Sequence, residues 1–153
     1  MARPVIRAKV SNLPEIQAAF AAQPEKVRLG VIDALKVIGL LVLNRAKSRL
    51  QGGSKTGRRY KRGAVTHQAS APGESPATDT GKLVSSGEWS VDEANLWVTI
   101  SFTAFYARLL EFGTRFILPR PFILPALDQV KEQIPAIFEK AIRARLKGGG
   151  DGE

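Results

Sequence analysis

The spacing of apolar positions predicts a long amphipathic helix from Pro24 to Leu50. Its apolar residues recur at steps of three and four, which keeps them on one face of a helix. Pro24 suits the first turn, where its missing N–H removes no hydrogen bond, and Gly52-Gly53 provides a left-handed stop after the last apolar position. The expected apolar face consists of Val27, Val31, Ala34, Leu35, Ile38, Leu41, Val42, Ala46 and Leu50.

A different period follows further along the chain. Two segments, Glu88–Val91 and Leu96–Phe102, are separated by the polar residues 92–95, a pattern that predicts an antiparallel hairpin with a four-residue turn. The second segment alternates apolar with polar or amphipathic residues, as a strand with one buried face does. We expect the face that carries Leu96, Val98, Ile100 and Phe102 to pack on the long helix, through Val31, Leu35, Ile38 and Val42.

The C-terminal part of the chain predicts two further helices. Phe105, Leu109 and Phe112 mark a two-turn helix that Gly113 ends. Residues 116–122 contain two prolines, which favours an extended segment and at most an edge strand. Helical spacing returns from 122 to 146, where Pro135 should kink or split the helix.

Residues 51–82 follow neither period and predict one long loop, rich in Gly, Ser, Thr, Pro and charge. Loops of this length are usually functional, or disordered until something orders them. Asp79 should cap a short helical turn that begins near Leu83. The densest positive charge of the chain lies in this loop, at Lys55, Arg58, Arg59, Lys61 and Arg62, with Tyr60 among them.

The sequence as a whole predicts an α+β fold. A long N-terminal helix packs on a small antiparallel sheet, a long loop at 51–80 joins that helix to the hairpin, and a short helix and a kinked C-terminal helix follow. We expect a single domain at 24–147, an N-terminal arm at 1–23 with a short helix at 12–20, and a flexible glycine-rich tail at 148–153.

Composition narrows the classes of function. The chain has 153 residues and a formal net charge of +9, so its surface attracts polyanions. It has no cysteine and one histidine, which excludes disulfides, thiolate metal sites and most imidazole-based catalytic triads. No apolar run approaches the ~20 residues of a membrane span, and no secretory signal is evident, so we expect a cytoplasmic protein without a membrane partner.

No constellation of catalytic residues appears. Gly81-Lys82 lacks the earlier glycine and the hydroxyl of a phosphate-binding loop. His67 has no second ligand at metal spacing and should form a hydrogen bond to solvent or a partner. Glu111 should end a short helix and pair with Arg108 or Arg115, in preference to acting as a general base. We therefore expect no catalytic residue, no cofactor and no metal, and we do not expect an enzyme.

The basic cluster leaves three interpretations open: a solvated loop, an arm at a protein interface, or a direct contact with nucleic acid. Each lysine or arginine could hold a phosphate. A single aromatic residue does not provide the repeated stacking platforms of single-strand binders.

Two stretches of sequence resemble a known family. The segment His67–Leu83 contains ASAPGE-x-PA-x-x-TG-x-L, and Tyr106–Thr114 followed by Pro119–Leu127 contains YA-x-x-x-EFGT and RPF-x-x-PAL. With TG-x-x-Y at Thr56–Tyr60, these motifs are similar in order and spacing to those of the tail-component family of tailed bacteriophages. The resemblance spans about 24–146.

The resemblance implies a non-enzymatic neck or tail-completion protein of the virion, present in the host cytoplasm during assembly. It implies a homo-oligomeric ring, a hexamer in preference to a dodecamer, that contacts neck, connector and tail-tube proteins and touches passing DNA without reading its sequence. The alternative is a basic DNA-binding or DNA-packaging accessory protein. The loop residues expected at an assembly interface are Arg58, Arg59, Tyr60, Lys61, Arg62, His67, Pro72 and Glu74. The motif residues expected to be structural are Gly81, Leu83, Tyr106, Glu111, Phe112, Gly113, Pro121, Phe122 and Pro125.

Overall fold

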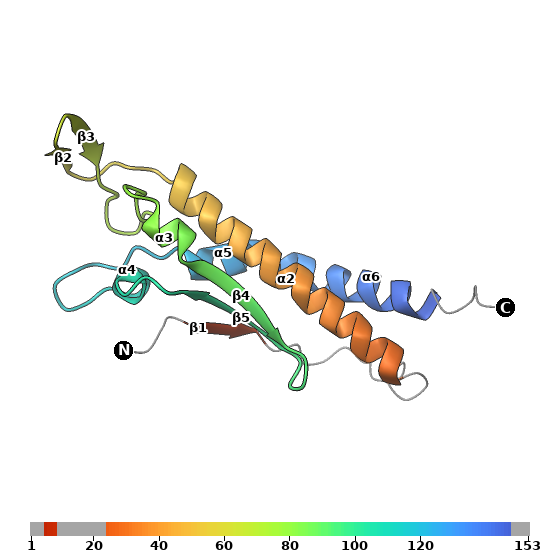
Figure 1. Ribbon diagram of the computed structural model, residues 1–153. Coiled ribbons are helices and arrows are strands. Elements are labelled where there is room, and N and C mark those ends of the chain that lie inside the picture. Colours follow the sequence, from red (N-terminus) through yellow and green to blue (C-terminus); the bar gives the residue numbers. More distant parts are fainter. Residues whose placement is uncertain (1–4, 9–23, 148–153) are drawn as a thin grey trace.

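The computed structural model describes residues 5–8 and 24–147, and it confirms the α+β class. The long helix α2 (Pro24–Gly52) lies between a three-stranded antiparallel sheet and the C-terminal helices (Figure 1). The sheet has the order β1-β5-β4 and consists of β1 (Val5–Ala8), β4 (Gly87–Asp92) and β5 (Trp97–Phe102).

The predicted contact between the long helix and the hairpin is confirmed. Leu35 and Ile38 are 1% and 2% exposed, and Val98 on β5 is fully buried. Gly39 brings the helix close to the sheet, because a Cβ at this position would come within 2.7 Å of the Trp89 ring. A side chain at residue 39 would therefore force α2 away from β4.

Gly30 allows an equally close contact on the opposite side of α2. A Cβ at Gly30 would lie 2.7 Å from the Cα of Ile142 in α6 (Ile134–Lys147). Arg145 of α6 also donates a hydrogen bond from Nε to Asp33 Oδ2 at 2.6 Å. This bond holds the pKa of Asp33 below its ordinary value, and burial opposes the shift. α2 is thus packed closely on both sides.

The hairpin β4–β5 forms as predicted, but its four-residue turn lies one position later than expected, at 93–96. Gly87 pairs with Phe102 at one end and Asp92 with Trp97 at the other. Leu96, which was expected in the strand, lies in the turn with a φ of 55°. The Asp92 carboxylate accepts hydrogen bonds within the turn from the side-chain amide and the N–H of Asn95 and from the N–H of Ala94, and these bonds, the Asn95 side chain first, lower its pKa.

The N-terminal region contributes a strand that the sequence did not indicate. β1 pairs antiparallel with β5, from Val5 opposite Ser101 to Ala8 opposite Val98. It lies inside the expected arm at 1–23. The helix expected at 12–20 and the tail at 148–153 fall outside the described residues.

The C-terminal helical segment is split, as the position of Pro135 in the sequence led us to expect. It consists of α5 (Ile123–Val130), the 3₁₀ turn η1 (Lys131–Gln133) and α6. Pro135 is the second residue of α6, where a missing N–H removes no helical hydrogen bond. The break therefore comes just before the proline.

Residues 116–122 form no strand, so the edge strand allowed for this segment is absent. The Arg120 N–H donates instead to the Leu110 carbonyl, and the Pro119 carbonyl accepts from the Gly73 N–H. The expectation of one loop without strands at 51–82 is wrong. The loop at 51–82 contains a two-stranded hairpin, β2 (Arg59–Arg62) and β3 (Val65–Gln68). β2 is exposed at every position, so it carries no alternating apolar signal.

Candidate functional site

The hairpin β2–β3 extends beyond the C-terminal end of α2 (Figure 1). β2 contains Arg59, Lys61 and Arg62 of the predicted basic cluster, and Lys55 and Arg58 precede it. Tyr60 and His67 face each other across the strands with ring centroids 5.8 Å apart. Gly63, with a φ of 62°, forms the turn. The two short strands have no alternation of apolar and polar residues, so the sequence pattern did not indicate this hairpin, and the glycine at its turn was the available signal.

Asp79 holds the hairpin against the rest of the loop. Its carboxylate pairs with the guanidinium of Arg62 and lies 3.2 Å from His67 Nδ1. The expected cap role of Asp79 is wrong, because the residue before α3 (Lys82–Ser85) is Gly81, with a φ of 74° and no side-chain cap. His67, expected to bond to solvent or a partner, lies within bonding distance of a carboxylate of its own chain.

Glu74 fixes the base of the loop. Its carboxylate accepts hydrogen bonds from the Thr56 hydroxyl at 2.6 Å, from the Thr56 N–H at 3.1 Å and from the Ala71 N–H at 2.7 Å. These bonds, the Thr56 hydroxyl first, lower the pKa of Glu74. The neighbouring Pro72 is exposed. The sequence placed Glu74 at an assembly interface, but its carboxylate is occupied inside the loop.

The cations of the cluster differ in their partners. Arg62 is held by Asp79, and Arg59 Nε lies 3.4 Å from Gln68 Oε1. Within residues 5–8 and 24–147, the side chains of Arg58 and Lys61 have neither a hydrogen bond nor an ion pair. Both are exposed. These two charges are therefore available to another molecule.

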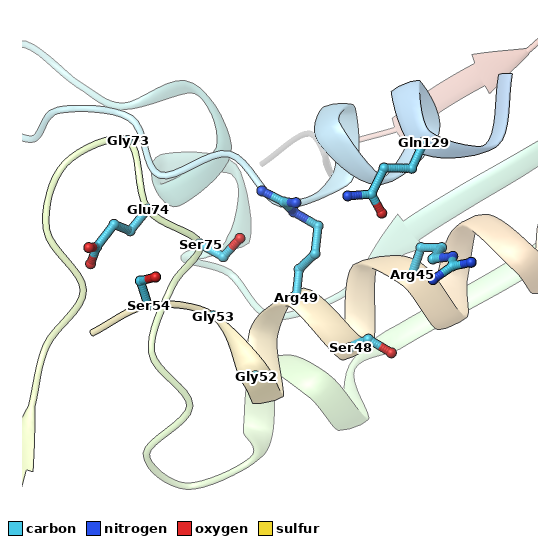
Figure 2. A pocket seen from close by; sticks show the side chains of 10 residues that line it. All are labelled: Arg45, Ser48, Arg49, Gly52, Gly53, Ser54, Gly73, Glu74, Ser75 and Gln129. Carbon is cyan, nitrogen blue, oxygen red and sulfur yellow. The ribbon is translucent and has the colours of Figure 1, made fainter. Parts of the chain in front are cut away.

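A polar groove of about 540 Å³ lies between the end of α2, the loop at 73–75 and α5 (Figure 2). The Arg49 guanidinium lies between Ser75 and Gln129, and its Nε is buried with no hydrogen-bond partner in the described part of the chain. Arginine and hydroxyl donors of this kind bind phosphates and carboxylates. The residues that line the groove are Arg45, Ser48, Arg49, Gly52, Gly53, Ser54, Gly73, Glu74, Ser75 and Gln129.

The sequence did not single out this groove. Arg45 and Arg49 occupy ordinary polar positions of the long helix, and only their spacing of four residues places them on one face. The residues that face them come from the loop at 73–75 and from α5, so the groove depends on tertiary structure.

Glu111 has a role other than the predicted one. It lies in α4 (Ala107–Phe112) and is 2% exposed. Its carboxylate accepts hydrogen bonds from the N–H groups of Phe122, Ile123 and Leu124 at 2.8, 3.1 and 2.9 Å. No ion pair joins Glu111 to Arg108 or Arg115 in the described residues.

The reason is the start of α5, whose first N–H groups have no partner inside the helix. The residue before that helix, Phe122, has no side chain that could cap it. The negative charge of Glu111 also suits the positive end of the helix dipole. A carboxylate from a neighbouring helix thus takes the place of a local cap.

The remaining motif residues divide between core and surface. Leu83 and Phe122 are buried, and Phe122 meets the Phe102 ring edge-on at 4.9 Å. Tyr106, Pro121 and Pro125 are half-buried. Gly113 has a φ of 70°, and a Cβ there would come within 2.6 Å of the Ile117 carbonyl. Phe112, by contrast, is 56% exposed.

Within the described residues, no group of three or more His, Cys, Asp or Glu side chains is arranged to hold a metal ion. None of the described helices has the length and apolar character to cross a bilayer. Comparisons of the chain with family models, with curated proteins and with solved structures gave no match.

Proposed function

We propose that this protein is a structural component of a tailed phage virion. It forms a ring at the head-proximal end of the tail or neck, completes the tail and joins it to the head. The observation that carries the proposal is the β2–β3 hairpin. It is a folded projection, anchored by Glu74 and Asp79, that leaves the charges of Arg58 and Lys61 exposed.

This arrangement supports an assembly arm over a solvated loop. Each of these carboxylate contacts restricts the backbone of the loop, so the hairpin has less conformational entropy to lose when it meets a neighbour. A rigid α2 with a projecting hairpin gives each subunit one fixed body and one segment that can reach a neighbour. Head-to-tail contacts of this kind close into rings when the rotation between copies permits.

The proposed partners follow from the same resemblance and charge. We favour a hexamer over a dodecamer, with neck, connector and tail-tube proteins as neighbours. Basic residues that face a central channel would touch passing DNA through its phosphates alone, without sequence readout. The protein would be found in the virion, and in the host cytoplasm during assembly.

A second candidate is a basic DNA-binding or DNA-packaging accessory protein. The groove with Arg45 and Arg49 favours it, because both arginines lack hydrogen-bonded or ionic partners within the described ranges and could hold backbone phosphates. The hairpin and the groove would then form a surface for duplex DNA.

Measuring the mass of the purified protein, alone and with tail tubes, separates the two candidates. We expect an oligomer of defined size that binds tube ends, and tail joining that depends on it. A protein that ignores tubes but binds bare duplex with a steep dependence on salt would favour the second candidate.

A further inference from the structure

The segment from Phe105 to Leu118 exposes six large apolar side chains. Phe105, Phe112 and Phe116 are 78%, 56% and 81% exposed, whereas Phe102, Phe122 and Phe138 are fully buried. Leu109, Ile117 and Leu118 are also exposed, at 41%, 43% and 65%. We call these six exposed residues the apolar tip. The predicted stripe of the short helix therefore faces solvent, with Ala107 and Glu111 buried in its place.

This exposure belongs to an ordered segment. The Thr114 N–H donates to the Ile117 carbonyl at 2.7 Å, and the Thr114 hydroxyl accepts from the N–H groups of Phe116 and Ile117. Arg120 bonds to Leu110 at 2.7 Å, and Glu111 fixes the chain beyond at the start of α5. A surface that is already held in one conformation loses less conformational entropy on binding, so this segment is preorganised for a contact.

The exposed area is large enough for a specific contact. A phenylalanine side chain has about 150–250 Å², so the three exposed rings alone present roughly 300–550 Å². The largest apolar patch of a typical monomer is about 300–600 Å². With Leu109, Ile117 and Leu118 added, the apolar tip approaches the ~800 Å² that each partner contributes to a standard interface.

Charge argues against contact between two identical tips. Arg108 and Arg115 are exposed beside the apolar residues, while Glu111, the acidic residue of this segment, is buried. A two-fold contact between tips would bring like charges together without a carboxylate to compensate them. The tip of one copy should therefore meet a different surface of the next copy.

The outer face of α2 offers such a surface. Val37 and Leu40 are 45% and 48% exposed and lie three residues apart, on one side of a rigid helix. Glu93 forms an ion pair with Lys36, the residue before Val37, at 3.0 Å. The carboxylate beside this face is therefore balanced by a lysine, whereas the exposed charges beside the tip are both positive, so a tip meets less like-charge repulsion here than at a second tip.

We propose that the apolar tip of one copy docks on the Val37–Leu40 face of a second copy, as a head-to-tail contact. The inference rests on the proposed function, since it supplies the contact between neighbours in the ring. Each copy carries both surfaces on different elements, so the contact propagates from copy to copy and can close into a ring.

Cysteine cross-linking tests the proposal directly, because the native chain has no cysteine. Phe116→Cys and Leu40→Cys variants, made with tags of different mass, are mixed, assembled and oxidised. We expect disulfide-linked pairs of unlike tags between positions 116 and 40, and few pairs between identical variants. Val65→Cys, on the hairpin and 57% exposed, is the control for a thiol of similar accessibility.

Several outcomes would overturn the inference. These are a predominance of 116–116 pairs, which indicates a two-fold contact, cross-links to position 65 as strong as those to position 40, or no intermolecular pair at all. If the oligomer on tail tubes persists in these cases, the proposed function stands without this contact. If the protein remains a monomer with and without tubes, both proposals fail.

A second variant does not depend on thiols. Replacing Phe112 and Phe116 together by Ser should leave the circular dichroism spectrum and the melting curve of the dilute, monomeric protein unchanged, because both side chains are exposed. It should weaken self-association by roughly tenfold or more, as loss of central aromatic residues does at other interfaces. Unchanged self-association would overturn the proposal.

Discussion

The helix–sheet core and the end of the molecule that carries the hairpin and the apolar tip are ordered by different forces. In the core, Leu35, Ile38 and Val98 bury their side chains completely or nearly so. At the other end, the apolar side chains of the tip are exposed, and the backbone is held by carboxylates. Glu74 and Glu111 each accept three hydrogen bonds from neighbouring segments.

The two regions therefore have different roles: the core stabilises the fold, and the other end holds exposed side chains in position for a partner. Apolar burial stabilises the whole fold, and its loss should weaken every element at once. The carboxylate bonds fix local segments and leave their apolar and basic side chains free for a partner. Substitutions in the core should therefore change global unfolding, whereas those at the loop end should change local order or assembly.

The largest effect is expected in the core. Leu35→Ala should lower the free energy of unfolding by about 2–5 kcal/mol, because it removes a buried side chain and leaves a cavity. Leu40→Ala is the matched control: it lies on the same helix but is 48% exposed, and should cost under ~0.5 kcal/mol. Urea unfolding of the dilute, monomeric protein measures both, because Leu40 also lies in the proposed contact between copies. Equal losses would place the buried face of α2 elsewhere.

Glu111→Ala should come next, at about 2–4 kcal/mol, because it leaves buried N–H groups at the start of α5 without an acceptor. Glu111→Gln keeps one oxygen and should lose less. Glu139→Ala, which removes an exposed i,i+4 pair with Arg143, serves as a control near zero. A loss for Glu111→Ala no larger than the control would contradict the assigned role.

The comparison also explains what the sequence could predict. The helix at 24–50, the hairpin at 88–102 and the split before Pro135 follow from periodicity and from proline, which act locally. Sequence placed the basic cluster correctly in the loop. It did not predict the β2–β3 hairpin, since β2 has no buried side, or the pairing of β1 with β5, which are far apart along the chain.

Glu111 shows the same limit most clearly. Its sequence neighbours Arg108 and Arg115 suggested an ion pair, but the donors that it satisfies lie beyond Gly113 at Phe122–Leu124. The exposure of Phe112 has a related cause, because burying Glu111 on one face of a six-residue helix turns the opposite face outward. Helical spacing alone does not decide which face is buried.

Loss of the ionised Glu74 carboxylate should have a smaller effect on stability, one that is confined to the loop and depends on pH. Hydrogen bonds from Thr56 and Ala71 hold the pKa of Glu74 below its ordinary value. The ionised carboxylate therefore stabilises the loop fully above the ordinary pKa, and this stabilisation is lost as the pH falls through the lowered folded-state pKa.

Hydrogen exchange of the Thr56 and Ala71 amides should show this. In the wild type, protection at these two amides should persist at neutral pH and disappear in acid. In Glu74→Gln it should be reduced at neutral pH, with the core amides unchanged. Equal protection in wild type and variant across the whole range would show that another group holds the loop.

The smallest effect on stability, and the sharpest test of the hairpin, comes from replacing Arg58 and Lys61 by Ser. Both side chains are exposed, so the free energy of unfolding should change by under ~0.5 kcal/mol. If the hairpin is an assembly arm, joining of heads to tails should fall while the fold stays intact. If it is a primary DNA site, the slope of log K against log salt should flatten by about 0.9 for each phosphate that the variant no longer binds.

Arg62→Ser is the matched control for this double substitution. It removes a similar charge, but one that is bound to Asp79, so it should act mainly by loosening the hairpin. We expect the assembly defect, because two unpaired cations on a narrow hairpin can bind few phosphates. Tight wild-type DNA binding in physiological salt, abolished by the double substitution while virions still assemble, would overturn the assignment.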